Sequence, residues 1–115
     1  TRLPIRGSRQ CMSAVRKGTD AERRVAKQGR EDGWLVASLR TESGAGDQVW
    51  LKRLEGRLIE VKATHEPYAG FGPSDRKALL ERAQVYDLEP LLAHCPTPTQ
   101  PVRFFGPGDW PATNS

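Results

Sequence analysis

Cysteine and long apolar segments are both scarce in this chain of 115 residues. Its two cysteines, Cys11 and Cys95, lie far apart and neither belongs to a C-x-x-C pair. The sequence therefore indicates neither a disulfide framework nor a zinc knuckle. No segment approaches the roughly 20 apolar residues that a membrane span needs, and the N-terminus has no apolar signal-peptide core. We expect a soluble, cytoplasmic protein with one folded domain.

Acidic residues are rare at the front of the chain, where basic residues are concentrated. Residues 1–30 contain nine Lys or Arg against two acids, a net of +7, whereas the remainder has nine basic and twelve acidic residues, a net of −3. Residues 1–17 alternate Arg with Pro, Gly and Ser without periodicity, which predicts a flexible basic arm. Such an arm suits a polyanion, because phosphate neutralisation supplies most non-specific affinity. The alternative interpretation is a basic tail that serves only solubility.

Two helices are predicted in the domain, which is expected over residues 18–105. The first runs from Thr19 to Asp32, with Thr19 as N-cap and Glu22 three residues later, the spacing of a capping box. The second begins at Ser74 as N-cap and ends at about Asp87. The helix positions leave three strand segments between them and two after the second helix.

Strands are expected over 34–39, 48–53, 58–64, 91–95 and 102–105. The second and third form an antiparallel hairpin with a turn at Glu55-Gly56. The resulting order, αβββαββ, favours an α/β domain with a central mixed five-stranded sheet flanked by helices. Residues 106–115 form a Gly/Pro-rich tail that is anchored at most by Trp110.

Three charged residues stand out in the predicted hairpin. Side chains alternate faces along a strand, so Glu60 and Lys62 share a face while Ile59 and Val61 point the other way. Asp47 begins the neighbouring strand, and two carboxylates placed together are unfavourable unless a cation lies between them. Hard oxygen ligands suit Mg²⁺ or Mn²⁺, and a lysine beside them can balance charge on a phosphate. The alternative is an ordinary solvent-facing Glu-Lys pair.

The combination of a helix Glu, a Gly-Asp and a Glu-Val-Lys is similar to the PD-(D/E)xK nuclease superfamily. Within it, residues 17–95 resemble the archaeal-type Holliday junction resolvases, which implies a restriction-endonuclease-like fold. The matching stretches are Lys17 to Arg23, Arg40 to Gly44, Gly46-Asp47, Ile59 to Ala63 and Leu88 to Ala93. Two positions depart from the family pattern: Gly46 replaces the proline before the acid, and Gln48 stands where an aliphatic residue is usual.

The resemblance implies roles for individual residues. Asp47 and Glu60 would bind the metal together with the Val61 carbonyl, Lys62 would be catalytic, and Glu22 would join the site from the first helix, where the capping box is its competing structural role. Predicted DNA contacts are Arg16, Lys17, Arg23, Arg40 and Ser43.

The function implied is a Mg²⁺-dependent crossover junction endodeoxyribonuclease, in which Mn²⁺ substitutes for Mg²⁺. It would act as a homodimer in DNA recombination and repair, because a four-way junction is pseudo-twofold and its resolution needs two symmetric cuts. Two alternatives remain. One is another branched-DNA, flap or nicking endonuclease of the same superfamily, and the other is a non-catalytic junction-binding module.

Overall fold

The computed structural model describes residues 9–111, and it describes side chains from residue 17 onward. Within these residues it contains two α-helices and five strands in the predicted order. The helices are α2 (Arg9–Glu31) and α3 (Pro73–Val85). The strands are β1 (Leu35–Ser38), β2 (Gln48–Lys52), β3 (Glu55–Lys62), β4 (Glu89–His94) and β5 (Arg103–Phe105). No helix among the described residues is both long enough and apolar enough to cross a membrane.

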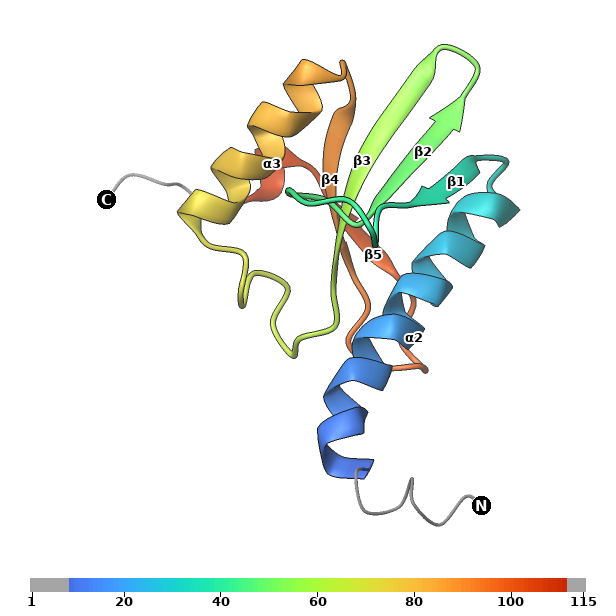
Figure 1. Cartoon of the computed structure of the whole chain (residues 1–115), viewed down its shortest axis with the longest axis vertical. Helices are drawn as coiled ribbons and strands as arrows, with labels where there is room; N and C mark the ends of the chain where they lie inside the picture. Colours follow the sequence, from blue (N-terminus) through green and yellow to red (C-terminus); the bar gives the residue numbers. More distant parts are fainter. Residues whose placement is uncertain (1–8, 112–115) are drawn as a thin grey trace.

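The described strands form one five-stranded sheet in the order β1-β2-β3-β4-β5 (Figure 1). β3 and β4 are parallel, and the other neighbouring pairs are antiparallel. Parallel neighbours need a crossover connection, which the segment containing α3 provides. The predicted mixed five-stranded sheet flanked by helices is therefore confirmed.

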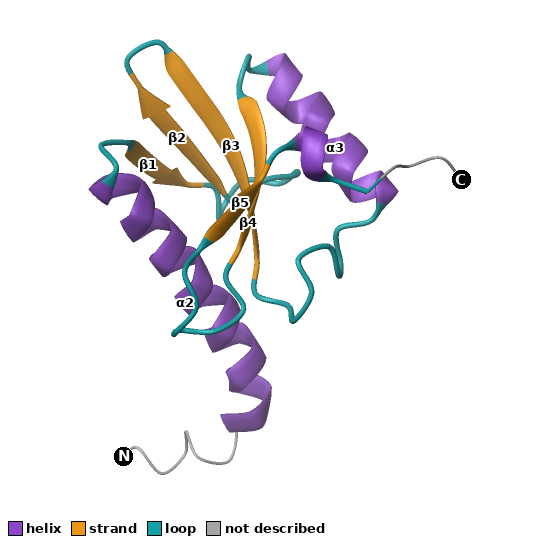
Figure 2. Ribbon diagram, turned by 180° about the vertical axis from the view of Figure 1, so that it is seen from behind, coloured by secondary structure: helices purple, strands orange, loops and turns teal. Residues whose placement is uncertain are grey.

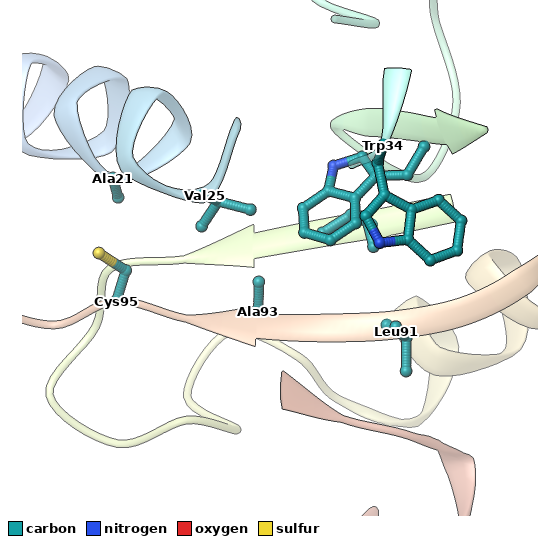
Figure 3. Close-up of a cluster of buried hydrophobic side chains, with 8 residues drawn as sticks. Ala21, Val25, Trp34, Leu91, Ala93 and Cys95 are labelled. Carbon is teal, nitrogen blue, oxygen red and sulfur yellow. The ribbon is translucent and has the colours of Figure 1, made fainter. Parts of the chain in front are cut away.

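The two helices pack on opposite faces of the sheet (Figures 1 and 2). On the α2 face, Ala21 and Val25 contact a core that includes Ile59, Ala93 and Cys95 (Figure 3). The helix approaches closely because its stripe is made of small residues. A Cβ added to Gly29 would lie 2.8 Å from the Trp50 ring.

The α3 face has its own core. Leu79 and Ala83 of α3 pack against Leu58 and Leu92, with Phe71 from the preceding loop. Leu58 and Ile59 are adjacent in β3 and belong to different cores, so this strand is covered on both faces. Beyond these two buried residues, β3 carries Glu60 and Lys62 toward its C-terminal end.

The first helix begins earlier than the sequence predicts. α2 starts at Arg9, so residues 9–17 of the expected arm are helical, and Thr19 lies inside the helix rather than at its N-cap. These residues include good helix formers and no proline, and a glycine at position 18 costs only about 1 kcal/mol in a helix interior. Glu22 is therefore not part of a capping box. Residues 1–8, the rest of the predicted arm, lie outside the described residues.

The hairpin turn is also displaced from its predicted position. Glu55 and Gly56 belong to β3, and the chain turns at Arg53 and Leu54 instead. The prediction is wrong because Arg53 takes a left-handed φ of +52°, a conformation that sequence patterns assign first to glycine. Gly56 is needed inside the strand, where a Cβ would lie 2.5 Å from a Leu88 methyl group.

The second helix and the tail differ in detail from expectation. α3 starts with Pro73 in its first turn and Gly72 as N-cap, not with Ser74 as N-cap. The Gly72 N–H donates to Asp75 Oδ2 at 3.0 Å. Asp75, and not Ser74, therefore provides the side-chain partner at the start of this helix.

The tail is anchored by more than Trp110 alone. The Trp110 indole donates to the Phe105 carbonyl at 2.9 Å, and its ring lies edge-on to Phe71 with centroids 5.1 Å apart. Arg76 donates to the Pro111 carbonyl at 3.1 Å. The tail up to Pro111 is therefore packed on the α3 face.

Candidate active site

Asp47 stands immediately before β2, at the end of the loop from β1. Its backbone N–H donates to the Ile59 carbonyl at 2.6 Å, and its Oδ2 accepts the Val61 N–H at 2.6 Å. These two contacts to β3 fix the carboxylate at the end of the β2–β3 pairing. Gly46 precedes it with φ +97°, a conformation that proline cannot adopt. This loop conformation therefore excludes at position 46 the proline that the resemblance would predict before the acid.

Glu60 and Lys62 extend from one face of β3, as strand alternation predicts. Lys62 Nζ lies 3.5 Å from Glu60 Oε2, and the two side chains are only 23% and 18% exposed. Glu60 Oε1 also accepts the Gly46 N–H at 3.1 Å, next to Asp47 in the chain. An ordinary solvent-facing pair would be largely exposed, so the structure does not support that interpretation. The two acids and the lysine form one half-buried cluster.

Glu22 approaches this cluster from α2, and a buried glutamine fixes its backbone. Gln48 is 3% exposed. Its Nε2 donates to the Glu22 carbonyl at 2.7 Å, and its Oε1 accepts the Trp50 indole N–H at 3.0 Å. Because Gln48 follows Asp47 directly, this bridge connects the helix acid to the strand acid.

The electrostatic environment of the three acids is unfavourable to their ionised forms. Burial raises the pKa of Glu22, Asp47 and Glu60, and the Asp47 charge raises the pKa of the other two further. The Lys62 ammonium opposes the increase in the pKa of Asp47 and Glu60. Acids that are removed from water and repel each other are stabilised by a bound cation.

Three clefts among the described residues share lining residues around these acids. The middle cleft, about 410 Å³, is lined in part by Glu22, Arg40 and Asp47. A second, about 340 Å³, shares Asp47 with it and adds Glu60. The third, about 200 Å³, shares Glu22 and Arg40 with the middle cleft. The three clefts therefore adjoin at these shared residues, and together they are called here the groove.

The donor set fits a divalent cation that takes few protein ligands. No group of three or more His, Cys, Asp or Glu in the described part of the chain is arranged as a metal site. Asp47 and Glu60 nevertheless offer two hard carboxylates, and Mg²⁺ characteristically binds through one or two carboxylates, waters and substrate phosphates. The residues present fit a metal whose coordination the substrate completes.

The predicted DNA contacts do not all lie at the groove. Arg23 and Arg40 line it. Ser43 is exposed in the loop before β2, and Lys17 is exposed on α2, where it lines a separate cleft. Arg16 belongs to α2, but its side chain lies outside the described residues.

Sequence reasoning missed an arginine that shapes the loop before Asp47. Arg82 of α3 donates from Nη1 to the carbonyls of Ser43 and Ala45, at 2.7 and 3.1 Å. This clamp connects the second helix to the loop that presents Asp47. Nothing in the local sequence indicates it, because the partners are carbonyls about 40 positions earlier.

His94 is a second missed residue. It is 5% exposed, its Nε2 lies 2.7 Å from the Thr64 carbonyl, and it is paired with Lys62 in the β3–β4 register. It therefore anchors the chain just beyond the site lysine. The signal in the sequence was a histidine directly after the apolar run Leu91, Leu92 and Ala93 of β4.

The fold is similar to that of a solved nuclease structure. Hjc, a Holliday junction resolvase from the archaeal hyperthermophile Archaeoglobus fulgidus, matches with a TM-score of 0.66 and 22% sequence identity, over 78% of this chain and 72% of its own. The chain has the restriction-endonuclease-like fold. The resemblance predicted from the sequence is thus confirmed at the level of the fold.

A relative is also found by sequence. A UPF0102 protein of Granulibacter bethesdensis is 31% identical over 96 residues, which cover 79% of this chain and 58% of that protein. The chain therefore spans little more than half the length of this relative. No family model matches the chain.

Proposed function

We propose that this restriction-endonuclease-like protein is a metal-dependent endonuclease that resolves four-way DNA junctions by paired phosphodiester hydrolysis. The observation that supports it best is the cluster of Asp47, Glu60 and Lys62 in a groove that also contains Glu22 and Arg40. Two half-buried carboxylates and a lysine held side by side are the groups that metal-assisted phosphodiester hydrolysis needs. The fold shared with a Holliday junction resolvase adds support for branched DNA as the substrate.

Asp47 and Glu60 would hold Mg²⁺, with the Val61 carbonyl as a further ligand, and Glu22 would add its charge from α2 beside Asp47. When bound, Mg²⁺ supplies Lewis acidity at the phosphate and lowers the pKa of a coordinated water. The protein must keep both acids ionised for this. The Val61 N–H on Asp47 and the Gly46 N–H on Glu60 favour the ionised forms, because hydrogen bonds to a carboxylate lower its pKa.

Lys62 would act on the charge that develops at the reacting phosphate. Its ammonium is held 3.5 Å from Glu60, so it stays beside the acids in the half-buried cluster. In this position it would orient the attacking water or donate to a phosphate oxygen. Arg40, which lines the middle cleft with Glu22 and Asp47, would neutralise adjacent negative charge.

One chain carries one such cluster, whereas junction resolution needs two symmetric cuts. We therefore propose a twofold-symmetric homodimer that presents two sites to opposite strands. Recognition would depend on junction shape and phosphates rather than bases, because the groove offers guanidinium groups that bind phosphate.

Cleavage of a synthetic four-way junction in Mg²⁺ and in EDTA tests this function, with products mapped on all four strands. We expect paired symmetric cuts near the crossover in Mg²⁺ and none in EDTA. Asp47→Asn should bind the junction without cutting it. Flap, nicked and linear duplexes serve as parallel substrates.

Preferential cutting of a flap or nicked duplex would replace junction resolution with a related nuclease activity. Tight junction binding with no cutting in Mg²⁺ or Mn²⁺, unchanged by Asp47→Asn, would refute catalysis and leave a junction-binding module.

A further inference from the structure

The smallest of the three clefts lies between α2 and β1 and is rich in arginine. Its lining includes Arg23, Arg30 and Arg40, with Ser38 and Glu22. We propose that this cleft, called here the arginine cleft, binds a backbone phosphate of the DNA strand beyond the scissile bond, and that Arg30 contacts this phosphate. The inference rests on the nuclease function proposed above and deepens it by assigning a substrate subsite.

Helix geometry brings two of the arginines to the cleft. Arg23, Ala26 and Arg30 line it together, and their spacing of three and four residues places them along one side of α2. The small Ala26 side chain leaves room between the two guanidinium groups. Arg30 therefore extends the basic surface about two turns further along the helix than the predicted contact Arg23.

The charge balance of the arginine cleft favours an anion. Arg23 pairs with Asp20 at 3.5 Å, but both side chains are largely exposed, and such surface pairs bind weakly. Within the described residues, neither Arg30 nor Arg40 forms a direct ion pair, although the Arg40 charge lowers the pKa of Glu22 in the same cleft. Guanidinium groups recognise phosphate through two parallel hydrogen bonds, so both arginines are available for a phosphate ligand.

Ser38 adds a neutral donor to the same cleft. Its hydroxyl oxygen accepts the Arg40 backbone N–H at 3.3 Å. The hydroxyl proton is then free to point into the cleft. A phosphate oxygen held there would have arginine on two sides and a hydroxyl donor from β1.

The groove has opposite polarity at its two ends, which sets a direction for the strand. The arginine cleft joins the middle cleft through Glu22 and Arg40. The far cleft is lined by Asp47, Glu60 and Asp75 and offers no basic side chain. A strand with its scissile phosphate at the acids would therefore place its next phosphates toward Arg30, and contacts on the other side of the cut would be weaker.

Arg30→Gln tests the subsite, with Lys27→Gln as the matched control. Both residues are exposed on α2 and differ by less than one turn, but Lys27 does not line the arginine cleft. Junction binding is measured in EDTA across a salt series, so that no cleavage interferes. We expect the slope of log K against log salt to fall in magnitude by about one for Arg30→Gln and to stay unchanged for Lys27→Gln.

A competing role for Arg30 is structural, because it stands in the last turn of α2, where a cation stabilises the helix. Thermal denaturation of the variant measures this contribution separately. Loss of this helix stabilisation cannot account for a changed salt slope of binding in a protein that remains folded.

Uncharged methylphosphonates, placed one at a time along the strand, locate the contact. We expect wild type to lose affinity when the phosphate that Arg30 contacts, on one side of the cut, is replaced. Arg30→Gln already lacks this contact, so the same replacement should cost it little further affinity. An unchanged salt slope in Arg30→Gln, or equal losses in both proteins at every position, would overturn the subsite.

The two hypotheses fail in different ways. A junction that is bound with an Arg30-dependent slope but is never cut in Mg²⁺ would remove the proposed nuclease function and leave the phosphate contact. Normal cutting, with a salt slope that does not depend on Arg30, would remove the phosphate subsite and leave the proposed nuclease function.

Discussion

Gln48→Leu tests whether the buried bridge between α2 and β2 holds Glu22 beside Asp47. Leucine keeps most of the side-chain volume, and the family pattern has an aliphatic residue here. The change leaves the indole N–H of Trp50, a residue that is 1% exposed, without its acceptor. The Glu22 carbonyl loses only the glutamine contact, because it lies within a helix and keeps its intrahelical partner.

The expected magnitude follows from these groups. A buried donor left without an acceptor costs about 1–3 kcal/mol, and the added apolar burial offsets roughly 1 kcal/mol. We expect a net loss of up to about 2 kcal/mol in the free energy of unfolding, equivalent to at most roughly 10 °C in Tm. A domain of ordinary stability remains folded after such a loss.

Urea denaturation and junction cleavage at 25 °C separate stability from activity. If Glu22 shifts, a loss of about 1.4 kcal/mol in transition-state stabilisation lowers the cleavage rate about tenfold in protein that is still folded. Gln84→Leu, at an exposed position of α3, is the control and should change stability by no more than about 0.5 kcal/mol. Wild-type cleavage by folded Gln48→Leu would refute the positioning role.

Gln48→Glu distinguishes the donor from the acceptor. The carboxylate still accepts from Trp50 but cannot donate to the Glu22 carbonyl, and burial raises its pKa. Protonation restores the donor, so the destabilisation should be larger at pH 8 than at pH 5. An equal loss at both pH values would show that the Glu22 contact contributes little.

Three further predictions concern stability. Burial raises the folded-state pKa of Asp47 above its unfolded value, so its ionised form destabilises the fold at neutral pH, and this cost disappears as pH falls through the folded-state pKa. Without metal, Asp47→Asn should therefore unfold at higher temperature than wild type at pH 7, with a gap that narrows toward pH 4 and closes when Mg²⁺ stabilises wild type; a gap that widens toward acid would contradict it. Gly46→Pro should destabilise by about 3 kcal/mol or more, since φ is +97° and its N–H donates to Glu60. Gly18→Ala, inside α2 with nothing within 4 Å of the added Cβ, should stabilise by about 0.5–1 kcal/mol in the same denaturation assay.

The strand pattern correctly predicts which face of β3 Glu60 and Lys62 share, whereas their proposed roles depend on Asp47, Glu22 and the family resemblance. Glu60 and Lys62 interrupt an apolar strand at a spacing of two, and the alternation rule alone places them on one face. The same rule separates Leu58 from Ile59 into two cores, which is what a sheet covered on both faces requires. Local periodicity therefore predicts a strand covered on both faces and the side of β3 on which Glu60 and Lys62 lie.

The misjudged features depend on partners far away in the chain. The start of α2 was missed because Arg, Gly and Ser suggested an arm, although the residues after position 8 tolerate a helix. The Arg82 clamp joins α3 to a loop that precedes it by 37 to 39 positions. The acceptors are backbone carbonyls, which every residue type has. The sequence of the loop therefore does not indicate that an arginine binds it.

The two departures from the family pattern flank Asp47, and each has a physical cause in this structure. Gly46 takes a left-handed φ that proline cannot reach, and in doing so it directs its N–H to Glu60. Gln48 replaces an aliphatic contact with a hydrogen-bonded one to α2. Proline would have fixed the approach to the acid through its ring and could not have donated. Here hydrogen bonds on both sides of Asp47 connect it to Glu60 in one direction and to Glu22 in the other, so the alignment of the three acids depends on residues 46 and 48 together.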